Sequence, residues 1–178
     1  MKAITLIEPW CWAIAHAGKN IENRTWVTRY RGVLVLHSGK AKLDAYGVQI
    51  IHEITGRPMG EIAKAANRLR GKVTAVCRLV NIEKPRRFRH SSLIKPLDET
   101  NPWAMKGQNH WCLIDVIPMP RPFPARGAQG LWENRDAFIE VKRQVETLAA
   151  SEDEKMRQLA LRMGTYIDRS LARLRPRR

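Results

Sequence analysis

The stretch GVLVLHSGK at residues 32–40 decides the fold class. Its apolar residues follow one another without alternation, which is typical of a strand covered on both faces. Ser38-Gly39-Lys40 then ends the run, because a Ser-Gly pair is a common turn signal. The stretch therefore predicts a buried strand at residues 33–37 in the middle of a sheet.

A shorter strand and a helix precede this central strand. Residues 3–7 have the composition of a strand that stops at Glu8-Pro9. A helix then begins with Pro9 in its first turn, and Gly18 is placed as its C-terminal cap. We expect the charged segment that follows, residues 19–24, to be a loop at the end of this helix.

Further elements follow the central strand, and a basic segment separates two of them. The patterns predict helices at 42–54 and 59–69 and strands at 72–82 and 110–117. The segment 83–106 is rich in Pro, Ser and basic residues, so we expect an exposed basic loop. Prolines stand at every second position from 118 to 124, which predicts an extended segment along a sheet edge.

Two helices are predicted to close the chain. The first has Phe138, Val141 and Val145 on one face, and the second follows a capping box at residues 151–154 and has an apolar stripe from Leu159 to Leu174. These faces either pack on the core of the same chain or bind a protein partner. Both alternatives fit the sequence.

Short strands, turns and a few helices together predict an α+β fold, a small mixed β-barrel with peripheral helices. We expect residues 1–135 to form this domain and residues 136–178 to form a C-terminal helical extension with a basic tail.

The charge balance indicates the kind of partner. The 178 residues include 32 Lys and Arg against 17 Asp and Glu, a net charge of +15. Such an excess favours a polyanion such as nucleic acid, although it could also serve solubility alone. We expect eight basic residues to contact the nucleic-acid backbone: Lys84, Arg86, Arg87, Arg89, Arg173, Arg175, Arg177 and Arg178.

The cysteines and the apolar runs indicate the compartment. Cys11, Cys77 and Cys112 lie in apolar segments without pairing motifs, so they are predicted to be buried thiols rather than zinc ligands or disulfides. No run is long enough to span a membrane and no secretory signal is evident. We expect a cytoplasmic protein without a membrane partner, a metal or a cofactor.

A set of short motifs carries a family resemblance. The chain has Lys19-x-x-Glu22-x-Arg24 after the first helix, then HSGK at residues 37–40, and later RGAQGLW at residues 126–132. In this combination the chain resembles the ASCH domain family of the PUA-like superfamily, although Ala17 stands where the family signature usually begins with glycine. The resemblance covers roughly residues 1–135 and implies a pseudo-barrel with a cleft that holds RNA or a nucleotide.

The signature residues suit such a cleft. Arg24 would grip a phosphate or a base edge, and Lys19 would act as a base if a neighbouring cation lowered its pKa. Glu22 would orient both or accept a proton, so Lys19, Glu22 and Lys40 are the candidate catalytic residues. The competing interpretation is an ion pair between Glu22 and Arg24 that holds the loop, with Lys19 in solvent.

Other residues are predicted to join the cleft. Lys40 and His37, at the end of the central strand, would meet phosphate and shuttle protons, with Ser38 and Tyr30 nearby. Trp103 and Trp132 would stack on a base, whereas Trp10, Trp12, Trp26 and Trp111 are predicted to be core residues.

The resemblance leaves three functions open. The first is RNA or nucleotide binding without chemistry. The second is a metal-independent ribonuclease that uses Lys19 and Lys40, because some family members have that activity. The third is an amidohydrolase acting on an acylated nucleoside such as N4-acetylcytidine, which is disfavoured because Glu22 occupies the position of the threonine nucleophile.

Overall fold

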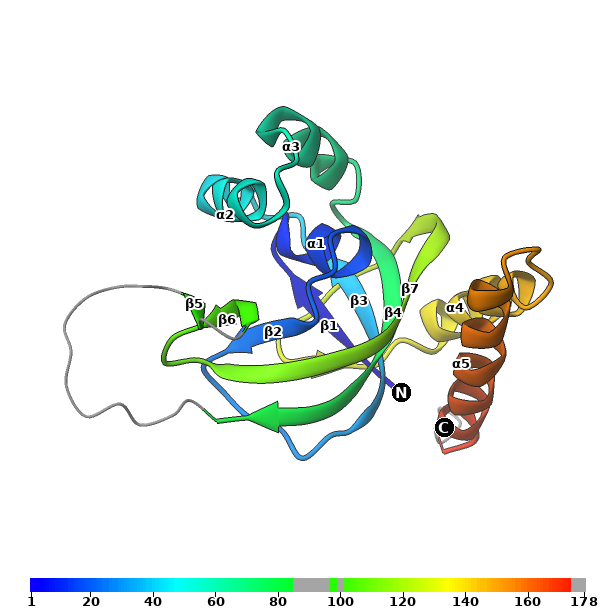
Figure 1. The fold of residues 1–178 in the computed structure, drawn as a ribbon. Coiled ribbons are helices and arrows are strands. Elements are labelled where there is room, and N and C mark those ends of the chain that lie inside the picture. The colour runs from blue at the N-terminus through cyan, green and yellow to red at the C-terminus, as the bar shows by residue number, and fades with distance from the viewer. Residues whose placement is uncertain (85–96, 99–100, 174–178) are drawn as a thin grey trace.

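The computed structural model describes residues 1–84, 97–98 and 101–173. In this part of the chain, five helices surround a curled, mixed six-stranded sheet that forms a half-barrel (Figure 1). The fold is therefore α+β, as the sequence predicts.

The strand order in the sheet is β2-β7-β4-β3-β1-β8. Strands β1 and β3 are parallel and every other pair in the sheet is antiparallel. The bounds are β1 Lys2–Leu6, β2 Ile21–Arg24, β3 Gly32–Ser38, β4 Lys72–Glu83, β7 Asn109–Pro124 and β8 Leu131–Trp132. A separate hairpin pairs β5 (Leu97–Asp98) with β6 (Asn101–Met105).

The central strand is β3, as its apolar run predicts. Its residues 33–38 are all buried, because β3 lies between β1 and β4 and helices cover both faces. The face toward the C-terminal helices contributes Val33 and Val35 to one core cluster. The opposite face contributes Leu34 and Leu36 to a second cluster beneath α1 (Trp10–His16).

The proline-rich segment is extended, and it continues β7 beyond the strand predicted at 110–117. It pairs with β4, while β2 covers only residues 109–112 of β7. Gln144 of α4 (Arg135–Leu148) closes the other side, because its side chain accepts a hydrogen bond from the Arg121 backbone N–H at 3.0 Å and donates one to the Arg121 carbonyl at 2.9 Å. A side chain thus satisfies an edge that has no strand beside it.

Two predictions about loops were wrong. The segment 19–24 is not all loop, because residues 21–24 form β2 and pair with β7. The expected basic loop at 83–106 contains β6, since Trp103 and Ala104 are buried in a third core cluster with residues of α1, α2 (Ala45–Thr55) and α3 (Met59–Asn67). Lys84 is exposed, whereas Arg86, Arg87 and Arg89 lie outside the described residues.

The C-terminal helices pack on the sheet of the same chain. Phe138, Val141, Met163 and Ile167 of α4 and α5 (Glu154–Ala172) are buried in the cluster that includes Val35. The stripe therefore serves the core rather than an exposed partner surface. The predicted capping box was wrong, because Asp153 caps α5 by accepting a hydrogen bond from the Met156 N–H at 3.1 Å.

The curl of the sheet brings its two ends together. Strand β8 pairs with β1 only at Ala3 and Ile4, so the Thr5 carbonyl is free to accept a hydrogen bond from Arg24 Nη2 of β2 at 3.2 Å. Arg24 thus spans the gap between one end of the sheet and the strand next to the other end. Within the described residues, no helix is long and apolar enough to cross a membrane.

Candidate functional site

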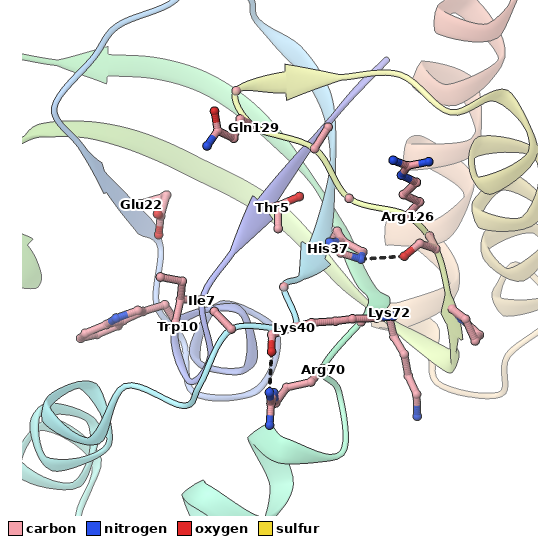
Figure 2. A pocket seen from close by; sticks show the side chains of 18 of the residues that line it. Thr5, Ile7, Trp10, Glu22, His37, Lys40, Arg70, Lys72, Arg126 and Gln129 are labelled. Carbon is pink, nitrogen blue, oxygen red and sulfur yellow. Dashed lines mark hydrogen bonds between the residues drawn. The ribbon is translucent and has the colours of Figure 1, made fainter.

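A cavity of about 1550 Å³ opens where β1 faces β2. Its walls come from several separate segments: β1, β2, the region after β3, the start of β4, and residues 124–130 (Figure 2). The half-barrel therefore creates the cavity by curling, and no single motif encloses it.

The walls are strongly cationic. Five Lys and Arg residues line the cavity, and Glu22 is the one carboxylate among its lining residues. The cations are Arg24, Lys40, Arg70, Lys72 and Arg126. Arg70 Nη2 donates a hydrogen bond to the Lys40 carbonyl at 2.5 Å, which ties the start of β4 to the turn after β3. Such a wall attracts anions, because like charges in a concave site reinforce one another.

Glu22 is held between two cations. Glu22 and Arg24 are two residues apart on β2, so their side chains share a face of the strand. Arg24 Nε lies 3.1 Å from Glu22 Oε1, and Lys19 Nζ lies 3.2 Å from Glu22 Oε2. Lys19 also donates a hydrogen bond to the Ile21 carbonyl. The ion pair of the competing interpretation is present, but Lys19 is not in solvent.

Lys19 lies behind the cavity wall rather than in it. The residue is 1% exposed and does not line the cavity, and its ammonium group lies 5.7 Å from the centre of the Trp10 ring. Burial lowers the pKa of Lys19, Glu22 opposes this change, and Arg24 adds to the lowering. The Lys19 ammonium group is therefore enclosed beside the Trp10 indole and contacts Glu22 rather than the cavity.

His37 lies on the floor of the cavity in its neutral form. Its Nε2 lies 3.1 Å from the Ala125 carbonyl, so Nε2 carries the proton and Nδ1 is left as an acceptor without a hydrogen-bond partner among the described residues. Burial lowers the pKa of His37. Two backbone carbonyls raise this pKa, and the positive charge of Lys40 lowers it. The ring is 3% exposed.

Gly127 packs directly on this floor. A Cβ at residue 127 would lie 2.6 Å from the His37 ring and 2.6 Å from Thr5 Oγ1, closer than real carbon contacts. Only glycine permits this approach. The segment 124–130 is therefore seated against β1 and β3, and it forms the wall opposite β2 (Figure 2).

The two tryptophans predicted to stack on a base do not line the cavity, whereas two of those predicted to be core residues do. Trp10 and Trp26 pack against core clusters, as the sequence predicts, but they also line the cavity. Trp12 and Trp111 are buried core residues, as predicted. Trp103 is buried in the cluster with α1–α3, and Trp132 is buried behind the floor, where Nε1 donates to Thr5 Oγ1 at 3.1 Å. Neither Trp103 nor Trp132 lines the cavity.

The remaining candidates lie around the site. Tyr30 donates its hydroxyl to the Val33 carbonyl at 2.5 Å, and burial raises its pKa to about 12. Ser38 is fully buried beside Glu8, outside the cavity lining. Arg173 is exposed at the end of α5, whereas Arg175, Arg177 and Arg178 lie outside the described residues.

Sequence reasoning missed two groups. Arg70 and Lys72 became wall residues only through the turn that joins α3 to β4. Glu8 is fully buried, its Oε2 accepts from the Trp12 N–H at 3.0 Å, and burial raises its pKa to about 7. The sequence feature that could have drawn attention to Glu8 was its place before Pro9, at the start of a helix.

The free thiols and the possible metal ligands can be located in the described part of the chain. Cys11 and Cys77 are buried free thiols, as predicted, and Cys112 is half-buried. Among residues 1–84, 97–98 and 101–173, no three His, Cys, Asp or Glu side chains gather in a way that could hold a metal ion. No protein-family model matches the chain, and no curated protein is significantly similar to it.

Proposed function

We propose that this protein binds RNA or a nucleotide in the cationic cavity between β1, β2 and residues 124–130. The observation that carries the proposal is the lining itself, in which five cations and two indoles surround a single carboxylate. Lysine and arginine bind phosphates, and indole rings stack on bases, so the lining suits both parts of a nucleotide.

The charge of the whole chain supports a polyanionic ligand. A net charge of +15 draws nucleic acid toward the protein before specific contacts form. The volume of about 1550 Å³ exceeds the range usual for a small-molecule pocket, so it accommodates more than one nucleoside. These features favour a short single-stranded segment.

The family resemblance agrees with this function. Two of the three signature residues of the ASCH-like motif, Glu22 and Arg24, line the cavity, and HSGK and RGAQG contribute to its walls. A PUA-like identity of the half-barrel would place the ligand in the same cleft. The PUA-like identity is therefore part of the proposal, as is the RNA-binding role.

Binding is favoured over the two enzymatic alternatives. The ribonuclease alternative relies on Lys19 as a base and the amidohydrolase alternative on a nucleophile at position 22, yet the Lys19 ammonium is enclosed and Glu22 is already paired with two cations. Lys40 is exposed at the cavity, but among the described residues that line the cavity, no acidic residue is paired with it. Binding requires only the charges and rings that the cavity contains.

The test measures fluorescence anisotropy of a labelled single-stranded RNA pool at several salt concentrations. We expect Lys40→Ala with Arg70→Ala to weaken binding and to reduce the slope of log K against log salt by about 1.4, if each contacts one phosphate. The matched control is Lys155→Ala with Arg169→Ala, two exposed cations on α5. Binding that is absent in the wild type, or equally weakened in both variants, would refute the proposal.

A further inference from the structure

The single carboxylate in the cavity has a lone-pair arrangement that selects among bases. From this arrangement we infer that the Glu22 end of the cavity is a guanine subsite. The inference rests on the proposed nucleotide-binding function and adds the identity of the base.

Glu22 retains acceptor capacity on both oxygens. An ionised carboxylate offers about four lone-pair sites, two on each oxygen. Lys19 occupies a site on Oε2 and Arg24 faces Oε1, so each oxygen keeps one. The side chain is 11% exposed and lines the cavity, which directs the remaining capacity toward a ligand. The result is one remaining acceptor site on each of the two adjacent carboxylate oxygens.

Guanine is the common base that matches two parallel acceptors. Its Watson–Crick edge places the N1–H and the 2-amino group side by side as two donors, so it makes a bidentate, charge-assisted contact with a carboxylate. Adenine and cytosine each present one donor beside a ring nitrogen lone pair, and uracil presents one donor between two carbonyls. The carboxylate repels these lone pairs, so Glu22 both favours guanine and disfavours the other bases.

The ion pairs of Glu22 with Lys19 and Arg24 also keep the Glu22 carboxylate in place. Lys19 is fully buried and has contacts with Glu22, the Ile21 carbonyl and the face of Trp10. Arg24 is fixed at its other end by the Thr5 carbonyl. Because both partners are anchored, the carboxylate is oriented before a ligand arrives, which reduces the entropy lost on binding.

The two ends of the cavity suit the two ends of a nucleotide. Glu22 and the Trp10 ring lie on one side of the view in Figure 2, whereas Lys72 and Arg126 lie on the other. A base against Glu22 would therefore be near an indole, and its phosphate would be directed toward Thr5 and the cations beyond. The polarity of the site gives the nucleotide one orientation.

The experiment changes the ligand first, so it needs no variant. GMP, IMP, AMP, CMP and UMP each compete with the labelled RNA for the wild-type protein. IMP differs from GMP by the absent 2-amino group, so it loses one hydrogen bond to a charged acceptor. We expect GMP to compete about tenfold better than IMP, and IMP better than the other three.

Protein variants then locate the effect. Glu22→Gln replaces one acceptor with a donor and is expected to abolish the GMP-over-IMP preference, whereas Glu53→Gln on the exposed face of α2 is expected to keep it. If Glu22→Gln does not fold, Glu22→Gln with Lys19→Met removes the buried charge as well and serves the same purpose.

The outcomes separate the inference from the proposed function. Equal competition by all five nucleotides, a preference that survives in the Glu22 variants, or no competition by GMP would each overturn the guanine subsite while RNA binding stands. The proposed function itself would be removed by failure of the wild type to bind RNA, or by equal weakening of binding in the Lys40/Arg70 variant and its α5 control.

Discussion

The pair of Lys19 and Glu22 leads to a prediction that the two single variants are unequal. Lys19 is 1% exposed, and among the described residues Glu22 is the one carboxylate paired with it, at 3.2 Å. Glu22 has a second cationic partner, Arg24, at 3.1 Å. Glu22→Gln therefore leaves a buried ammonium group without a counter-charge, whereas Lys19→Met leaves Glu22 paired.

The difference can be expressed as a change in the free energy of unfolding. Leaving one member of a buried ion pair uncompensated costs about 3–5 kcal/mol, while replacing the buried cation with an apolar chain of similar length costs much less. At about 2–4 °C per kcal/mol for a chain of this size, Glu22→Gln lowers Tm by roughly 6–20 °C. Lys19→Met lowers it by a small fraction of that, and the double variant regains much of the loss.

Thermal unfolding followed by circular dichroism measures all four proteins of this double-mutant cycle. Additive effects, or an equal loss in both single variants, would refute the reasoning, because they would mean that the charges do not depend on each other.

The pH dependence of the same variant gives an independent check. The pKa of Lys19 lies below its ordinary value of 10.5 in the folded protein, and loss of Glu22 lowers it further because Glu22 raises it. The unfolded chain then binds more protons, so stability rises with pH in this window. The deficit of Glu22→Gln is expected to shrink between pH 7 and pH 9.5, and a constant deficit would contradict the burial of the charge.

Three further predictions concern stability. Burial raises the pKa of Glu8 from 4.5 to about 7, so its contribution is full below 4.5 and is lost as pH rises through about 7; urea unfolding at pH 5 and pH 8 should show a loss on the order of 3 kcal/mol that Glu8→Gln removes. Gly127→Ala should lower the free energy of unfolding by about 1–3 kcal/mol, because the added Cβ would press on the cavity floor. Gly164→Ala in α5 should raise the free energy of unfolding by up to about 1 kcal/mol, because its added Cβ would meet nothing within 4 Å. Asp153→Ala should cost about 1 kcal/mol and Ser151→Ala much less, since Asp153 is the cap; equal losses would contradict this assignment.

The sequence alone determined the features that depend on neighbours along the chain. The unbroken apolar run of β3 indicated a strand buried on both faces, and the spacing of Phe138, Val141 and Val145 indicated the face of α4 that packs inward. These patterns are local, because a strand or helix places its side chains at fixed intervals.

Only the tertiary structure decided which of these side chains meet. Trp10 and Trp26 are as apolar in sequence as Trp103 and Trp132, yet the first two line the cavity and the last two are buried. Lys19 belongs to the same sequence motif as Glu22 and Arg24, yet those two residues line the cavity and Lys19 lies behind its wall. The reason is that the cavity forms where the curled sheet brings β1, β2 and residues 124–130 together. Contacts such as Arg24–Thr5 and Trp132–Thr5, which join residues 19 and 127 positions apart, leave no period in the sequence.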